Sequence, residues 1–185
     1  QAIILGIVQG ITEFLPISSS GHLVIFPWIL GWEYQGTSFD AAVHVGTLLG
    51  VIAYFWQAWK GMILSLRHGY RKDHFAQRLL FFIFLATIPG ALAGYFFRDL
   101  IESAFRTPEV VASALILFSV VIFLGEKLGA KIKDLSHLNW QKALLVGLFQ
   151  ALAIIPGISR SGATISAGLF LGLRRAEAAK FSFLL

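Results

Sequence analysis

Two short polar segments hold the residues of this sequence that are able to do chemistry. Residues 9–22 contain Glu13 and a run of three serines, and residues 156–164 contain Arg160 between two serines. Gln9 precedes Glu13 by four residues, so the two side chains share one face of a helix. Two oxygen-bearing side chains at this spacing suit a hard cation such as Mg²⁺ or Ca²⁺, or the positioning of a water molecule. Gln9 and Glu13 are therefore the candidate metal ligands.

The serines of each segment mark the expected start of a new helix, because serine is a preferred N-cap residue. The first N–H groups of a helix are unpaired and lie at its positive dipole end, which binds anions and phosphate in particular. Arg160 adds a planar guanidinium that matches phosphate oxygens. The candidate phosphate-binding residues are Ser18, Ser20, Gly21, Ser159, Ser161, Gly162 and Thr164.

Ser19 and His22 lie three residues apart and supply a hydroxyl and a group that acts as acid or base near neutral pH. The alternative for a single histidine among apolar neighbours is a packing role. The alternative for Glu13 and Arg160 is a buried salt bridge between the two segments. Because their neighbours favour a phosphoryl site, the candidate catalytic residues are Glu13, Ser19, His22 and Arg160.

The composition places these segments in a membrane protein. Of 185 residues, 57% are hydrophobic and 14% are charged, against about 25% charged in soluble domains. This excludes a soluble globular domain, and 17 Phe and 5 Trp exclude a disordered chain. The absence of cysteine excludes disulfides, zinc fingers and thiol catalysis. Because the composition is that of a membrane protein, the net charge of +5 does not indicate nucleic-acid binding.

Apolar runs free of charge predict membrane-spanning helices at residues 41–59, 79–97 and 110–125. Residues 2–32 and 143–173 are equally apolar, but each is interrupted by a polar segment that contains proline. The pieces on either side of each break are too short to span a bilayer. We expect two re-entrant helix pairs; two spanning helices kinked at proline are the alternative.

The two broken regions also resemble each other. Residues 6–25 align with residues 147–166 and share Ile-Ser-x-Ser-Gly after a proline, which indicates an internal duplication. Three spans between the copies make the second enter from the opposite face, so we expect a single all-α integral membrane domain with an inverted-topology repeat. Residues 1–127 form the first repeat and residues 140–185 begin a second, truncated one. We expect about three further spans by symmetry, and a native start upstream with no cleavable signal peptide.

The basic residues support this orientation, because cytoplasmic loops are enriched in Lys and Arg. The loops predicted on the outer side of the membrane, residues 26–40 and 98–109, hold only two basic residues, Arg98 and Arg106. The first break then opens from the outer face of the membrane. The predicted cytoplasmic side holds Lys60, Arg67, Arg71, Lys72, Arg78, Lys127, Lys131, Lys133, Lys142, Arg174, Arg175 and Lys180.

Residues 9–22, Gln-Gly-Ile-Thr-Glu-Phe-Leu-Pro-Ile-Ser-Ser-Ser-Gly-His, resemble the first signature of the undecaprenyl-pyrophosphate phosphatase family, also called bacitracin-resistance proteins. Residues 156–164, Pro-Gly-Ile-Ser-Arg-Ser-Gly-Ala-Thr, resemble the second. The resemblance implies hydrolysis of undecaprenyl diphosphate to the monophosphate at the outer face of the bacterial inner membrane. It further implies recycling of the cell-wall carrier lipid, bacitracin resistance and a need for a divalent cation.

Carried over by position, Gln9 and Glu13 take the role of the acidic motif, with Gln9 as a permitted variant of the first acid. Ser19, His22 and Arg160 take the catalytic roles. Two schemes stay open at this point: Ser19 attacks phosphorus while His22 moves the proton, or His22 activates a water molecule. The expected partners are the polyprenyl diphosphate and membrane lipids, without nucleic acid, and a homodimer is compatible with the sequence.

Transport is the rival class of function, because inverted repeats with broken helices are also the architecture of secondary transporters. In a lipid-phosphate flippase, Glu13 would couple transport to protons. A structural membrane subunit is a third class, which two facing polar breaks disfavour.

Two more polar residues lie at the start of the first predicted span. His44 either lines the cavity or lies near the membrane interface, and Asp40 is placed to orient the head group.

Overall fold

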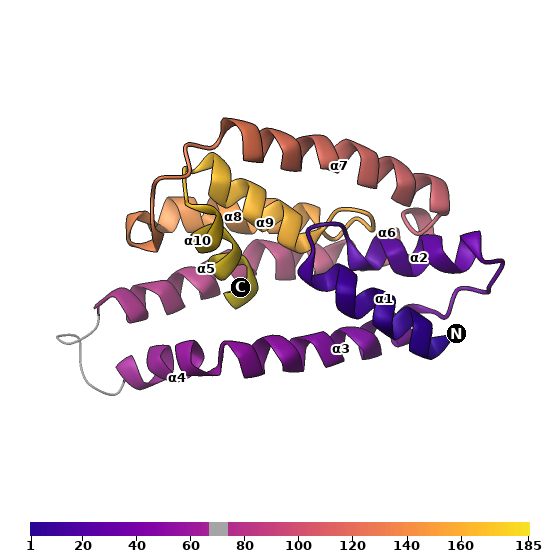
Figure 1. Ribbon diagram of the computed structural model, residues 1–185, viewed down its shortest axis with the longest axis horizontal. Helices are drawn as coiled ribbons and strands as arrows, with labels where there is room; N and C mark the ends of the chain where they lie inside the picture. The colour runs from indigo at the N-terminus through magenta and orange to yellow at the C-terminus, as the bar shows by residue number, and fades with distance from the viewer. Residues whose placement is uncertain (67–73) are drawn as a thin grey trace.

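The structure is a computed structural model that describes residues 1–66 and 74–185, and its elements are helices (Figure 1). Three of the residues predicted on the cytoplasmic side, Arg67, Arg71 and Lys72, lie outside the described residues. Within the described part, the only β pairing is an isolated parallel bridge between Lys133 and Leu173. The helices are α1 (Ala2–Phe14), α2 (Ser19–Ile29), α3 (Thr37–Tyr54), α4 (Trp56–Ser65), α5 (His74–Phe96), α6 (Arg98–Ala104), α7 (Pro108–Leu128), the 3₁₀ helix η1 (Leu135–His137), α8 (Trp140–Leu152), α9 (Arg160–Phe170) and α10 (Arg175–Leu184).

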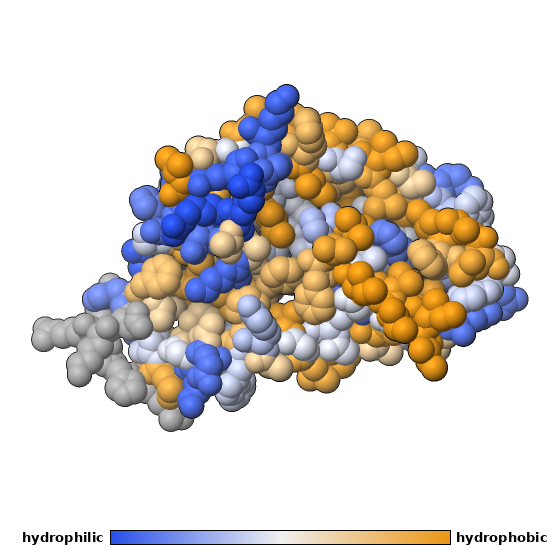
Figure 2. Space-filling model, viewed as in Figure 1, coloured by the Kyte–Doolittle hydropathy of each residue, from blue (hydrophilic) through white to orange (hydrophobic). Residues whose placement is uncertain are grey.

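Three of the described helices, α3, α5 and α7, are long and apolar enough to cross a membrane, which confirms the three predicted spans. The first boundary differs, because predicted span 41–59 runs across Phe55, where α3 ends and α4 begins. On the face that Figure 2 shows, hydrophobic residues cover much of the surface between hydrophilic ends. A helix that faces lipid needs no polar outer side, so this surface fits a membrane protein.

Both predicted breaks are present. α1 ends at Phe14, and Leu15 is extended because a proline follows it. Ser18 then caps α2 by accepting a hydrogen bond from Gly21 N at 3.3 Å. In the second break, Ser159 caps α9 in the same way, with Gly162 N as the donor at 3.0 Å.

The two broken regions have matching dimensions. α1 and α8 are each 13 residues long, and α2 and α9 are each 11 residues long. At 1.5 Å per residue these helices are shorter than the bilayer core. α1 packs on α2, and α8 packs on α9. Each broken region is therefore a hairpin of two short helices.

The breaks of the two hairpins meet (Figure 1). A Cβ added to Gly21 would lie 3.2 Å from the Cα of Gly157, a tighter contact than side chains normally make. Gly157 itself has a φ of +99°, a left-handed conformation that favours glycine. A Cβ there would also lie 2.6 Å from the carbonyl oxygen of Val111 in α7. Glycine is thus required at position 157, and Gly21 makes room for the close contact that brings the two polar segments together.

The principal core lies where α5 packs on α8, flanked by α9 and α10. Ala86 of α5 and Val146 of α8 are fully buried. Gly147 faces the α5 backbone, and an added Cβ would lie 2.5 Å from the carbonyl oxygen of Ala86. Small residues at such a contact let two membrane helices approach closely. This packing supports α9, which carries Arg160.

Substituting Gly147 by Ala is expected to lower the free energy of unfolding by roughly 1–3 kcal/mol, because the new methyl group meets backbone that cannot turn away. Gly94→Ala is the control, since a Cβ at Gly94 of α5 meets no atom within 4 Å. The measurement is thermal unfolding of the purified protein in detergent. A Gly147→Ala variant as stable as Gly94→Ala would contradict the close packing of α5 on α8.

Candidate active site

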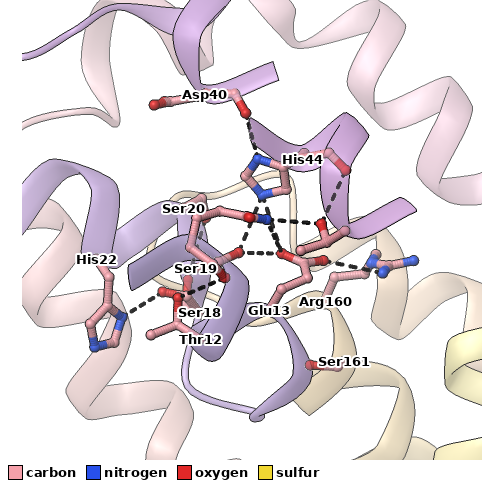
Figure 3. A network of polar contacts seen from close by, with 12 residues as sticks. Thr12, Glu13, Ser18, Ser19, Ser20, His22, Asp40, His44, Arg160 and Ser161 are labelled. Carbon is pink, nitrogen blue, oxygen red and sulfur yellow. Dashed lines mark hydrogen bonds and ion pairs between the residues drawn. The ribbon is translucent and has the colours of Figure 1, made fainter. Parts of the chain in front are cut away.

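The carboxylate of Glu13, at the end of α1, lies at the centre of a polar network (Figure 3). Its Oε2 accepts hydrogen bonds from Ser19 Oγ at 2.5 Å and from Gln9 Nε2 at 3.4 Å. Its Oε1 accepts from Arg160 Nη2 at 3.4 Å. The pairing of Glu13 with Arg160 joins residues 147 positions apart, so the predicted meeting of the two segments occurs.

Arg160 and Glu13 differ in exposure. The side chain of Arg160 is 43% exposed, and that of Glu13 is 14% exposed. Arg160 lies in the first turn of α9, where the helix presents unpaired N–H groups. Its contact with Glu13 is long for a charged hydrogen bond. The guanidinium is therefore placed to bind an anion that enters beside Glu13.

His44 of α3 completes the network, and sequence reasoning had left its role open. Its Nε2 lies 3.2 Å from Ser19 Oγ and 3.3 Å from Glu13 Oε2. Its Nδ1 donates a hydrogen bond to the main-chain carbonyl of Asp40 at 2.6 Å. A signal was present in the sequence: Asp40, His44 and Thr47 follow helical spacing on one face of an apolar span.

Gln9 connects α1 to α3 rather than standing open to solvent. It is 1% exposed, and its Nε2 donates to Thr47 Oγ1 at 3.0 Å as well as to Glu13. Thr47 is not among the residues predicted from the sequence, although its helical spacing from Asp40 and His44 could have indicated it. The role of Gln9 as a metal ligand stays a prediction.

A polar pocket of about 200 Å³ opens between the two breaks. Of the predicted phosphate-binding residues, the four serines lie on its wall. The two glycines and the threonine support the helix starts instead: Gly21 N and Gly162 N bond the capping serines, and Thr164 Oγ1 bonds Ser182 of α10 at 2.6 Å. The pocket is lined by Thr12, Glu13, Ser18, Ser19, Ser20, His44, Ala153, Ser159, Arg160 and Ser161.

His22 lies apart from this network (Figure 3). Its Nδ1 donates back to the carbonyl of Ser18, one turn earlier, at 2.7 Å. The ring lines a different cavity, of about 210 Å³, together with Phe118 and Ile122. The structure therefore does not bring His22 together with Glu13 and Arg160, and its catalytic role stays a prediction.

A larger and mainly apolar groove of about 700 Å³ begins at the same network. Glu13, His44 and Arg160 line it as well as the polar pocket. From there it follows α3 and α4 as far as Trp59 and Ile63. The polar pocket and the apolar groove are thus joined in one site through these three residues.

Residues 2–185 match the family described as bacitracin resistance protein BacA. The chain belongs to this family. It is 45% identical over 185 residues to an undecaprenyl-diphosphatase of Pelotomaculum thermopropionicum, covering 100% of this chain and 69% of that protein. It is 50% identical over 187 residues to one of Thermodesulfovibrio yellowstonii, covering 100% and 68%. An undecaprenyl-diphosphatase of Idiomarina loihiensis is 48% identical over 185 residues, covering 99% and 70%.

The donor atoms of this BacA family site bear on the expected divalent cation. Among the described residues, no group of three or more His, Cys, Asp or Glu side chains is arranged to hold a metal ion. Glu13 supplies one carboxylate, and Ser18, Ser19 and Ser20 supply hydroxyl oxygens at the same pocket. Mg²⁺ is commonly held by one or two carboxylates together with substrate phosphates and waters. The residues therefore fit a cation that shares its ligands with a diphosphate.

A second charged cluster holds the start of α3. Asp40 is 7% exposed, and its Oδ2 accepts from Tyr34 Oη at 2.5 Å and from Arg106 Nη1 at 2.9 Å. Burial and the hydrogen bond to Asp40 raise the pKa of Tyr34 above its ordinary value. This cluster ties the loop before α3 to the loop before α7. Asp40, predicted to orient a head group, has Oδ2 engaged with these neighbours and its carbonyl with His44.

Replacing Arg106 by Ala is expected to destabilise the protein by about 3 kcal/mol, because it leaves the buried carboxylate of Asp40 without its cation. Arg175→Ala is the matched control, since Arg175 pairs with Glu126 on an exposed surface and such pairs contribute little. Chemical or thermal unfolding in detergent measures both variants. Equal stability of the two variants would show that the Asp40 cluster does not hold α3 in place.

Proposed function

We propose that this chain is a membrane phosphatase that hydrolyses undecaprenyl diphosphate to the monophosphate and phosphate, and so recycles the carrier lipid of cell-wall synthesis. The observation that carries the proposal is the joined site. Glu13 and Arg160 line both a polar pocket that holds Ser19 and an apolar groove of about 700 Å³. A diphosphate head on an isoprenoid tail has this same two-part chemistry. The names of the relatives support the assignment.

In the proposed mechanism, Ser19 is the nucleophile. Its Oγ attacks the terminal phosphorus, the bond from that phosphorus to the bridging oxygen breaks, and the lipid monophosphate leaves. Glu13 Oε2 is placed to receive the serine proton, because the two oxygens lie 2.5 Å apart. Water then hydrolyses the phosphoserine to release phosphate. Arg160, with its exposed guanidinium, turns to the phosphate oxygens and stabilises their charge during transfer.

The second scheme, in which His22 activates water directly, finds less support in the geometry. His22 donates to the main chain of its own helix and lines a separate cavity. Ser19 instead lies within hydrogen-bond distance of Glu13 and on the wall of the pocket. We therefore place the nucleophile at Ser19.

We further propose that a divalent cation, Mg²⁺ or Ca²⁺, takes part. Glu13 and the neighbouring serine hydroxyls would hold it together with substrate oxygens. When bound, the cation neutralises negative charge on the diphosphate.

The proposed placement is the bacterial inner membrane, with the site open to the outer face and the two hairpins as halves of an inverted repeat. The equal helix lengths of the hairpins support the repeat. The excess of Lys and Arg in the loops of one predicted side supports the orientation. A homodimer stays a prediction. The rival function, a flippase or secondary transporter, has no support among the relatives compared, which are named as diphosphatases.

Ser19→Ala is expected to lower phosphate release from undecaprenyl or farnesyl diphosphate at least roughly 1,000-fold, because the nucleophile is gone. Ser103→Ala, at an exposed position of α6, should leave the rate unchanged. The measurement is phosphate release by the purified protein in detergent. Full activity of Ser19→Ala would reject the phosphoserine scheme, and a wild-type protein without activity would reject the function.

Arg160→Ala is expected to lower the rate of phosphate release at least about 100-fold. Arg160→Lys is expected to retain part of the lost activity, because lysine keeps the charge but not the paired donors. The same phosphate-release assay measures both. Activity unaffected in both variants would show that Arg160 is a salt-bridge partner of Glu13 and nothing more.

Removal of divalent cations by a chelator is expected to abolish phosphate release, and added Mg²⁺ or Ca²⁺ should restore it. Thermal unfolding measured in parallel separates a loss of chemistry from a loss of fold. Full activity after chelation would contradict the proposed cation.

A further inference from the structure

The mechanism above leaves His44 without a role, although His44 contacts both groups on which the attack of Ser19 depends. Its Nε2 lies 3.2 Å from Ser19 Oγ and 3.3 Å from Glu13 Oε2. The imidazole is about one third exposed and lines both the polar pocket and the groove. Ser19 and Glu13 come from α2 and α1, whereas His44 comes from α3. His44 is thus the link between the first hairpin and the first span.

The partners of the ring determine which of its nitrogens donate. The carbonyl of Asp40 can only accept, so Nδ1 is a donor. The Ser19 hydroxyl donates its single proton to Glu13 Oε2, because a carboxylate oxygen can only accept. Nε2 then faces lone pairs of Ser19 and Glu13, and a donor is what those lone pairs require. With both nitrogens donating, the ring has no lone pair to offer to the serine proton.

The position of His44 is determined by the rest of α3. Thr47 lies one turn further along, donates to the carbonyl of His44 at 3.0 Å and accepts from Gln9 of α1. Asp40 lies one turn earlier and is held by Arg106. α3 is therefore attached to α1 at one side of His44 and to the loop before α7 at the other. A side chain held in this way has little freedom to move during the reaction.

We propose that His44 is a positioning residue: as a hydrogen-bond donor fixed to α3, it holds the Ser19 hydroxyl and the Glu13 carboxylate in the geometry for attack. The proposal rests on the proposed phosphatase function. What the site requires at this point is an N–H at the place of Nε2. The amide of a glutamine side chain supplies such a donor from the same position and has no basic nitrogen, whereas leucine supplies neither.

The test compares His44→Gln and His44→Leu with the wild-type chain in the phosphate-release assay. His44→Leu is expected to lower kcat roughly 100-fold, the order of loss that follows when a reacting group is misplaced. His44→Gln is expected to stay within about tenfold of wild type. KM should change less than about twofold in both, because His44 holds the nucleophile and not the substrate. His137→Leu, at an exposed position of η1, is the control.

A His44→Gln variant as inactive as His44→Leu would overturn the proposal, because it would show that the basic ring is needed. Wild-type activity in His44→Leu, or a loss confined to KM, would overturn it as well. If His44→Leu does not fold, as judged by gel filtration and thermal unfolding, the kcat of His44→Gln decides alone. The wild-type rate tests the phosphatase function separately, and the ratio between variants tests His44.

Discussion

The ion pair between Glu13 and Arg160 requires two charged side chains, from segments far apart in the sequence, to meet in an apolar protein. Two charges inside an apolar protein are costly unless they face each other and find further hydrogen bonds. Each of them lies beside an interruption between two short helices, Glu13 in the last turn of α1 and Arg160 in the first turn of α9. The two proline-containing breaks meet this demand, because they bring polar ends from two hairpins to one point. Ser18 has a φ of +66°, which is unusual for a residue with a side chain. Backbone strain is therefore found at the residue that caps α2 and precedes Ser19, the proposed nucleophile.

Much of this arrangement could be predicted from the sequence, because local rules govern it. Pro16 disfavours helical geometry at Leu15, so α1 ends at Phe14, although Pro27 and Pro89 lie inside α2 and α5. Ser18 and Ser159 each cap a helix start through their own side chains. The pairing of Glu13 with Arg160 follows from charge, since each is the natural partner of the other in an apolar environment. The choice between His22 and His44 follows no local rule. His22 lies close to Ser19 in sequence, but its ring turns back to its own helix, whereas His44 reaches Ser19 only through the packing of α3 on α1.

The polar pocket and the apolar groove together suit a molecule that has a diphosphate head group and a lipid tail. Glu13 and Arg160 line the apolar groove at its polar end, so in the proposed function a head group bound there would place its lipid tail along α3. The groove wall there consists of apolar side chains such as Leu48 and Val51, which need no hydrogen bonds and impose little directional preference on a flexible chain. Discrimination between substrates therefore depends on the polar end, where a buried polar group left without a hydrogen-bond partner costs free energy.

Gln9 has a consequence for the charge of the site. A carboxylate at this position would lie one helical turn from Glu13 and repel it. The amide instead donates to Glu13 and to Thr47, so it supports the single carboxylate and also joins α1 to α3. The polar pocket then holds one carboxylate beside the guanidinium of Arg160 and the donor ring of His44. A diphosphate that enters adds negative charge of its own, and this added charge is what the proposed cation would offset.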